Sequence, residues 1–75
     1  MELKDYLVDF ADQFDYTDAN EINATTIFHD LDEWDSLLAL AVLNMTEKKY
    51  GKIITFDEMK KCVTVEDLFN VVASK

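Results

Sequence analysis

The sequence predicts an all-α fold: a small four-helix bundle with three longer helices, one short third helix and a long loop between the first two helices. Its 75 residues suffice for one domain with a modest core. The chain has no proline and a single glycine, which disfavours architectures built from strands and tight turns. Apolar residues instead recur at helical spacing between recognisable helix start and stop signals.

The first predicted helix has one apolar stripe whose members lie three and four positions apart: Leu3, Tyr6, Leu7, Phe10 and Phe14. A polar stretch, residues 15–33, follows with isolated apolar anchors at Ile22, Phe28 and Leu31. An unstructured loop of this length is uncommon in a compact domain. We therefore expect these anchors to hold the loop against the bundle.

The second predicted helix begins near Ser36 and ends around Tyr50. Lys48 and Lys49 fall in its last turn, where cations interact favourably with the helix dipole. Gly51 follows in the position of a left-handed C-terminal cap.

Two threonines are predicted N-terminal caps of the two remaining helices. Thr55, with Glu58 three residues later, predicts a capping box for a short third helix from Phe56 to Cys62. Thr64 with Asp67 forms a weaker version of the same device and opens the fourth helix. The buried stripe of that helix is expected to be Val65, Leu68, Phe69 and Val72.

The expected core combines the apolar stripes with the loop anchors: Leu7, Phe10, Phe28, Leu40, Leu43, Ile54, Val65 and Phe69. In the second helix, the stripe expected to face this core is Leu37, Leu40, Leu43 and Tyr50. Leu38 and Met45 would then be exposed apolar residues without an internal role. In the alternative arrangement, the helices splay enough to bury Leu38 and Met45 as well.

Charge excludes some partners. Sixteen acidic residues against seven lysines, with no arginine, give a net charge of −9 and argue against nucleic acid or an anionic membrane as partner. Residues 1–35 hold eleven of the acids and one lysine, a net charge of −10, whereas residues 36–75 are close to neutral. The acidic half is either a surface that meets a basic partner or an anionic face that favours solubility.

Cysteine use and the N-terminus predict a cytoplasmic protein. Cys62 is the only cysteine, so no internal disulfide can form, and we expect it to be a small core residue. No basic start precedes an apolar run at the N-terminus, so a signal peptide is not expected. The longest apolar run, Leu37 to Leu43, is too short to cross a bilayer. We expect a monomer without a membrane partner.

A set of spaced motifs surrounds the serine at the start of the second helix. In chain order they are Phe28 and Leu31, Asp35-Ser36-Leu37, Tyr50-Gly51, Ile54, and Thr64-Val65. With these motifs at these distances, the chain from Phe28 to Val72 resembles an acyl carrier protein. The resemblance implies a four-helix domain that carries a 4'-phosphopantetheine arm, taken from coenzyme A, on the serine of an Asp-Ser-Leu motif.

The resemblance also implies roles for the motif residues. Ser36 is the covalent anchor and not a catalyst, so the protein is not expected to be an enzyme. Asp35 caps the helix and helps to position the metal and coenzyme of a phosphopantetheinyl transferase. Leu37 turns inward and fixes the first turn. The implied function is to hold acyl intermediates as thioesters and to present them to acyl-loading and acyl-processing enzymes of fatty-acid, polyketide-like or other specialised biosynthesis.

Ser36 also has other possible roles. A plain helix cap is a common role for serine. A hydrolase nucleophile would need a G-x-S-x-G elbow and a base, but the sequence around Ser36 is Trp-Asp-Ser-Leu-Leu, and His29, the only histidine, falls in the long loop. The nearby carboxylates lack the glycine and terminal glutamate of a calcium loop, so no metal site is predicted.

The second helix departs from its relatives. In fatty-acid-synthesis members, an acidic stripe on this helix docks basic enzymes, but positions 38, 41, 45 and 48 are Leu, Ala, Met and Lys here. We therefore expect docking through apolar contact. The expected docking residues are Trp34, which would also pack at the helix entrance, Leu38, Ala41, Met45 and Glu47.

The resemblance covers nearly the whole chain. We therefore expect residues 1–75 to form a single, discrete acyl-carrier-like domain. The alternative function is an unmodified acidic helical module of the same fold that binds other proteins. The intact mass of protein recovered from its host separates the two, because a carrier should be found partly as the 4'-phosphopantetheine adduct.

Overall fold

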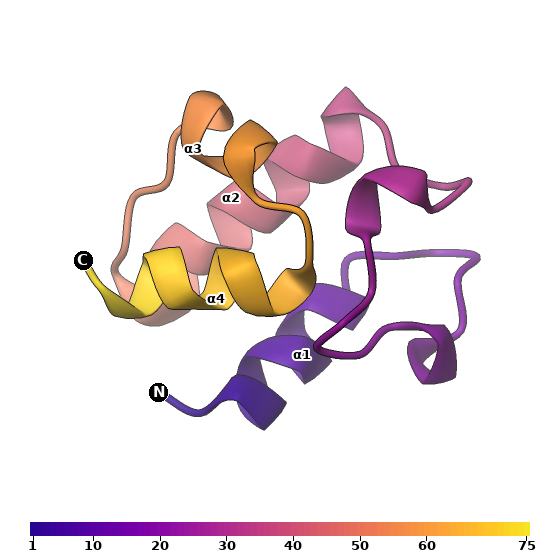
Figure 1. Ribbon diagram of the computed structural model, residues 1–75, viewed down its shortest axis with the longest axis horizontal. Coiled ribbons are helices and arrows are strands. Elements are labelled where there is room, and N and C mark those ends of the chain that lie inside the picture. Colours follow the sequence, from indigo (N-terminus) through magenta and orange to yellow (C-terminus); the bar gives the residue numbers. More distant parts are fainter.

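The computed structural model describes residues 1–75 and confirms a small all-α bundle (Figure 1). The helix bounds are Leu3–Ala11 for α1, Ser36–Tyr50 for α2, Phe56–Lys61 for α3 and Val65–Ala73 for α4. Two short 3₁₀ helices, Ala19–Glu21 and Phe28–Asp30, lie in the long loop. None of the helices combines the length and the apolar character needed to cross a membrane.

The end of α2 and the starts of α3 and α4 follow the local signals in the sequence, whereas α1 ends at Ala11, before Phe14 of the expected stripe. Gly51 ends α2 in the left-handed conformation, with a φ of 68°. Thr55 and Glu58 form a complete capping box at α3, and Thr64 and Asp67 form another at α4. Helix α3 ends at Lys61, one residue earlier than expected.

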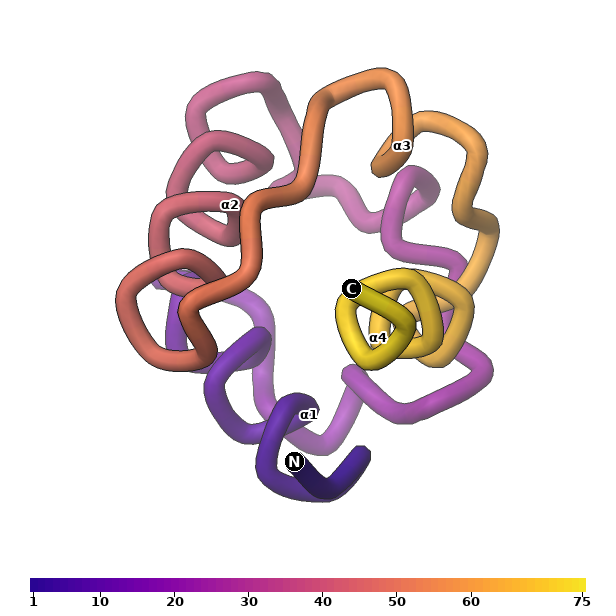
Figure 2. The backbone as a smooth tube through the Cα atoms, turned by 90° about the vertical axis from the view of Figure 1, so that its left-hand side faces the viewer, coloured from indigo at the N-terminus to yellow at the C-terminus, as the bar shows by residue number.

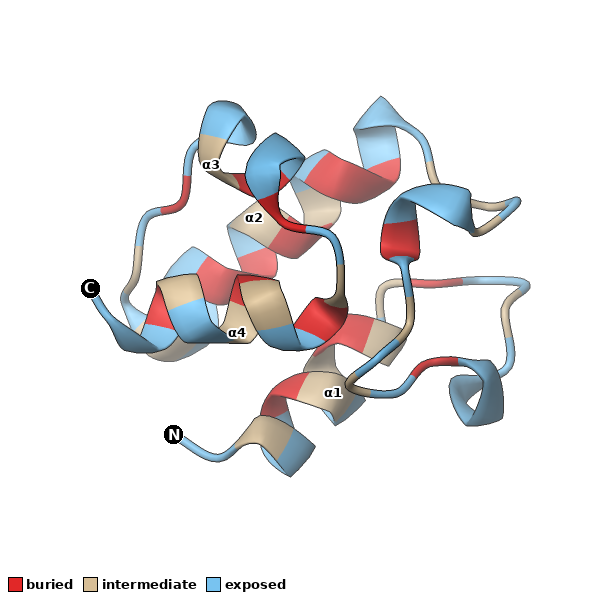
Figure 3. Cartoon of the chain, in the orientation of Figure 1, coloured by how far each residue is buried: buried red, intermediate tan, exposed pale blue.

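The helices enclose one core. Helix α1 packs against both α2 and α4, and Figure 2 shows the chain winding around a common centre, with α2 on one side and α3 and α4 on the other. Buried residues lie on the inward faces of the helices (Figure 3). Of the expected core, Phe10, Phe28, Ile54 and Val65 are buried. Leu7, Leu43 and Phe69 are partly buried and pack against it.

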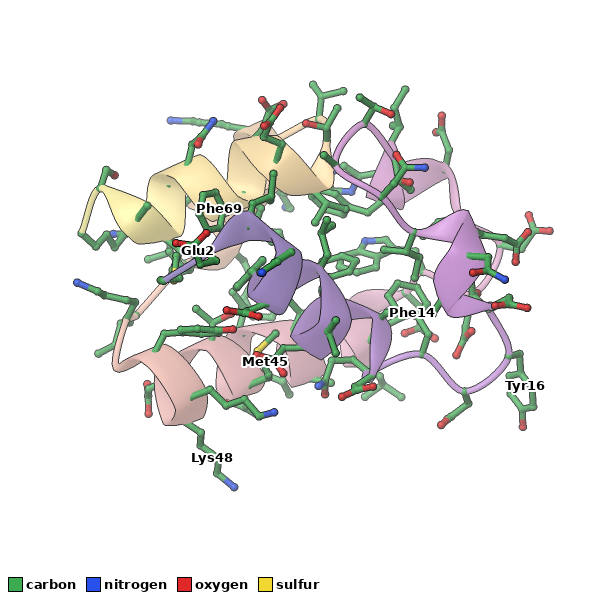
Figure 4. The ribbon with its side chains drawn as sticks, turned by 90° about the horizontal axis from the view of Figure 1, so that it is seen from below. Glu2, Phe14, Tyr16, Met45, Lys48 and Phe69 are labelled. Atoms are coloured by element: carbon green, nitrogen blue, oxygen red, sulfur yellow. The ribbon has the colours of Figure 1, made fainter.

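Helix α2 turns a different face inward from the one expected. Its buried residues are Leu38, Ala39, Val42, Met45 and Thr46. Leu37 is 76% exposed and Leu40 is 44% exposed, so their expected places in the core are wrong. Leu38 and Met45 are only 8% and 6% exposed, which confirms the alternative in which the bundle buries them. In Figure 4, Met45 lies between α1 and α2, whereas Lys48 points away from the protein.

A buried hydrogen bond accounts for the orientation of α2. The Oγ1 of Thr46 donates to the carbonyl oxygen of Val42 at 2.9 Å, and it lies 2.9 Å from the hydroxyl of Tyr6 on α1. Because Thr46 has already given its only proton to Val42, the Tyr6 hydroxyl is the donor in the second bond. The hydroxyls of Tyr6 and Thr46 can both be buried because they form a hydrogen bond with each other. The buried face of α2 thus includes a threonine, which apolar periodicity alone does not place in the core.

The long loop is held by polar contacts as well as by its apolar anchors. Ile22 and Phe28 are buried and Leu31 is partly buried, as expected. The backbone N–H groups of Val65 and Glu66, at the start of α4, donate to loop carbonyls at 3.1 and 3.0 Å. These bonds occupy N–H groups that α4 itself cannot satisfy.

One carboxylate, that of Glu33, joins the two ends of the long loop by hydrogen bonds. Glu33 accepts hydrogen bonds from the backbone N–H groups of Asp15 and Tyr16, at 2.6 and 2.9 Å, and from the hydroxyl of Thr17 at 2.8 Å. Glu33 therefore joins the residues that leave α1 to the residues that enter α2.

A polar network also joins α1 to the end of α2. The carboxylate of Asp9 accepts from the Nζ of Lys49 at 2.9 Å and from the hydroxyl of Tyr50. The hydrogen bonds from Lys49 and Tyr50 lower the pKa of Asp9 below its ordinary value. Asp9 consequently stays ionised to a lower pH in the folded protein than in the unfolded chain.

We expect this network to be lost in acid. A carboxyl group whose folded pKa is lowered adds stability above its unfolded pKa of about 4, and that contribution disappears as the pH falls through the folded value. Unfolding free energies measured by urea titration from neutral to acidic pH should therefore decline less steeply for Asp9→Asn than for the wild type. Asp12→Asn is the control, because the Asp12 carboxylate makes no hydrogen bond; superimposable profiles for all three proteins would contradict the expectation.

Candidate functional site

Ser36 is the first residue of α2 and its side chain is exposed. The residue before it performs the capping: Asp35 has an extended backbone, and its Oδ1 accepts the N–H of Leu38 at 2.8 Å. The Ser36 hydroxyl makes no hydrogen bond within the chain. The expected cap at Asp35 is therefore confirmed, and the interpretation of Ser36 as a plain helix cap is wrong.

Aromatic packing fixes the entrance to α2. The ring of Trp34 stacks on Phe10 of α1 at a centroid separation of 6.0 Å and an angle of 10°. It also meets the ring of Phe28 edge-on at 4.9 Å. Trp34 thus packs at the helix entrance as expected. A rigid entrance holds Ser36 in one position relative to the body of the protein.

The side chain of Leu37 does not support the first turn of α2. It was expected to turn inward, but it is among the most exposed apolar residues of the chain. Leu38 faces the core, and the preceding position 37 lies on a different side of the helix, which faces solvent. Leu37 and the partly exposed Leu40 therefore form an apolar surface beside Ser36, which periodicity alone did not reveal.

A cavity of about 250 Å³ opens between α2 and α3 at Ser36. Half of its lining residues are hydrophobic: Trp34, Ala39, Phe56 and Met59. Four polar residues, His29, Asp35, Ser36 and Lys60, complete it. The serine thus has an exposed hydroxyl and an adjoining apolar recess.

The structure gives Ser36 no hydrogen-bonded base. His29 lines the same cavity, but its Nε2 is hydrogen-bonded to the carbonyl oxygen of Cys62 at 3.1 Å, and no bond joins it to Ser36. No group of three or more His, Cys, Asp or Glu side chains is placed to hold a metal ion. Ser36 therefore has no hydrogen-bonded general base of the kind that activates a serine nucleophile.

The expected docking residues of α2 are only partly available to a partner. Leu38 and Met45 are buried, so the exposure from which their docking role was inferred is wrong. Ala41 is partly buried and Glu47 is exposed, and their docking role stays a prediction.

Comparison with known proteins relates the chain to a protein family. A family model described as "Phosphopantetheine attachment site" matches residues 5–72, which include Ser36 and most of all four helices. No curated protein and no solved structure gives a significant match.

Proposed function

The chain belongs to the phosphopantetheine-attachment family, and from this premise we propose that Ser36 is the residue that carries the arm. Members of this family bind 4'-phosphopantetheine covalently, so the domain is a carrier. One observation supports Ser36 above all: its hydroxyl is exposed and unbonded at the first residue of a helix whose cap is supplied by Asp35. A transferase can reach such a hydroxyl without breaking any internal bond.

The residues at the start of α2 fit a 4'-phosphopantetheine group attached to Ser36. Attachment joins the Oγ of Ser36 to the phosphorus that bears pantetheine; the hydroxyl loses its proton, and adenosine 3',5'-bisphosphate leaves coenzyme A. The resulting phosphodiester anion lies by the first N–H groups of α2, where a negative charge is favoured by about 0.3–1 kcal/mol. Once bound, the arm supplies a terminal thiol that holds acyl groups as thioesters.

The carrier is proposed to act in fatty-acid, polyketide-like or other specialised biosynthesis. Its partners would be a phosphopantetheinyl transferase and the enzymes that load and process the acyl group. Helix α2 lacks the acidic stripe of the fatty-acid-synthesis relatives, and its exposed residues near Ser36 include Leu37 and Leu40. These two leucines support a partner interface that depends on apolar contact more than on charge.

We expect a broad-specificity phosphopantetheinyl transferase with coenzyme A to add one arm to this protein. Intact mass spectrometry should show complete loss of the addition in Ser36→Ala. Ser74, the only other serine, provides the matched control, so Ser74→Ala should gain the arm as the wild type does. An unchanged wild-type mass, or an equal gain in Ser36→Ala, would refute the assignment and favour an unmodified interaction module.

A further inference from the structure

A second recess lies at the start of α2, between that helix and the beginning of the long loop. Its volume is about 330 Å³. Asp15 and Tyr16 of the loop line it from one side, and Leu37, Leu38 and Ala41 of α2 line it from the other. No residue of α3 contributes to its lining, so it is separate from the cavity between α2 and α3. We call this recess the Tyr16 groove.

The two most exposed large hydrophobic side chains of the protein both line this groove. Tyr16 is 91% exposed and Leu37 is 76% exposed. In Figure 4, Tyr16 projects from the loop away from the protein, whereas Phe14 points inward. Leu38 and Ala41, which are buried and half-buried, form the floor between them. Exposed apolar side chains around a recess are typical of a protein interaction surface, and tyrosine is a common anchor residue in such surfaces.

The backbone that carries Tyr16 is fixed although its ring is exposed. Its N–H donates to the Glu33 carboxylate at 2.9 Å, and the hydroxyl of Thr17 donates to the same carboxylate at 2.8 Å. Two residues before Tyr16, the ring of Phe14 is buried with its centroid 6.2 Å from that of Trp34. These contacts hold the loop against the entrance of α2. A partner that binds a surface already formed in this way loses less conformational entropy on binding.

The charges of the groove define the chemistry of a partner. Asp15, Glu33 and Asp35 line it, no lysine does, and both salt bridges of the structure lie elsewhere. Nucleic acid, an anionic membrane or a second copy of this chain, with its net charge of −9, would be repelled. A protein segment that combines an apolar side chain with lysine or arginine is complementary to the groove. An arginine there also gains attraction to the face of the Tyr16 ring.

We propose that the Tyr16 groove is the docking surface for the enzyme that modifies Ser36. A segment of that enzyme places an apolar side chain between Tyr16 and Leu37 and a lysine or arginine beside Asp15. The identity of this partner rests on the proposed attachment at Ser36. Because Leu37 directly follows Ser36 in the chain, an enzyme bound in the groove lies next to the serine hydroxyl. It approaches from the side of the long loop and leaves the cavity beside α3 uncovered.

The affinity of a broad-specificity phosphopantetheinyl transferase for the unmodified protein, measured by calorimetry without coenzyme A, tests the groove. We expect Tyr16→Ser to weaken binding about tenfold or more, because the partner loses a large apolar contact. Tyr16→Phe keeps the ring and should bind like the wild type. Ile53→Ser is the matched control, since Ile53 is 68% exposed but lies outside the groove, and its binding should be unchanged. Equal affinities of Tyr16→Ser and Ile53→Ser, or a wild type that does not bind, would overturn the groove.

A pair of charge reversals tests the basic character of the partner. Asp15→Lys should weaken binding several-fold, and the loss should shrink at high salt. Asp57→Lys makes the same change in net charge at an exposed residue of α3 and should bind like the wild type. Unchanged circular dichroism shows that both variants keep the fold. Equal losses in the two variants would mean that the enzyme responds to net charge or docks on α3, and would overturn the groove.

The attachment at Ser36 is tested separately, by intact mass after coenzyme A is supplied. A wild type that binds through the groove but gains no arm overturns the attachment alone. A wild type that gains the arm while Tyr16→Ser binds as well as Ile53→Ser overturns the groove alone.

Discussion

Replacing Phe10 with alanine is expected to lower the free energy of unfolding by about 3–5 kcal/mol. Phe10 is fully buried, and its ring lies near those of Tyr6, Phe14, Phe28 and Trp34, with centroids 5.5 to 6.5 Å apart. Its removal leaves a void that these rings, which come from different segments, cannot all move to fill. Domains of this size have a total stability of about 4–11 kcal/mol. Phe10→Ala is therefore expected to leave the protein close to unfolding.

The measurement is urea denaturation followed by circular dichroism, with Leu40→Ala as the control. Leu40 is apolar and helical like Phe10, but it is partly exposed and lies outside the buried core, so its truncation should cost about 1 kcal/mol or less. Equal losses for the two variants would mean that α2 turns Leu40 toward the core after all. A loss below about 1 kcal/mol for Phe10→Ala would show that the aromatic cluster is not the centre of the core.

Replacing Thr46 with valine is expected to lower the free energy of unfolding by about 1–3 kcal/mol. The two side chains have nearly the same shape, so the change removes a hydroxyl without opening a cavity. The hydroxyl of Tyr6 then stays buried without its partner, which costs more than the hydrogen bond itself contributed. Burial also raises the pKa of Tyr6 to about 12, because the ionised form would lose its hydration there.

A double-mutant cycle with Tyr6→Phe measures this coupling. Tyr6→Phe removes the donor and leaves the Thr46 Oγ1 still bonded to Val42, so its effect should be the smaller of the two. The double variant should be less destabilised than the sum of the single variants, because neither polar group is then left without a partner. Strictly additive losses would show that the two hydroxyls do not interact.

Local signals in the sequence determined the limits of α2 and the starts of α3 and α4. A capping box or a C-terminal glycine acts within one helical turn, so Thr55 with Glu58, Thr64 with Asp67, and Gly51 could be interpreted without knowledge of the fold. The Asp35-Ser36 pair at the start of α2 is equally local. For the same reason, the candidate attachment residue could be found from the sequence.

The rotation of α2 was decided by tertiary structure. Residues 37–43 are apolar on every side of the helix, so their pattern does not indicate which face is buried. The inward face is the one that brings Thr46 to Tyr6, forty residues away in the chain, and a polar residue in that position gives no apolar signal. Leu38 and Met45 were therefore assigned to the wrong side.

The surroundings of Ser36 likewise depend on contacts between distant segments. The cavity takes Trp34 from the segment that enters α2, Ala39 from α2 itself, and Phe56, Met59 and Lys60 from α3. Loop 15–33 reaches its place through the bonds of Glu33 to Asp15 and Tyr16. The sequence by itself determined where α2, α3 and α4 begin, where α2 ends, and which serine stands at a helix start, because those features depend on neighbours in the chain. The face that α2 buries and the recess beside Ser36 depend on which helices meet, and only the packed bundle decides that.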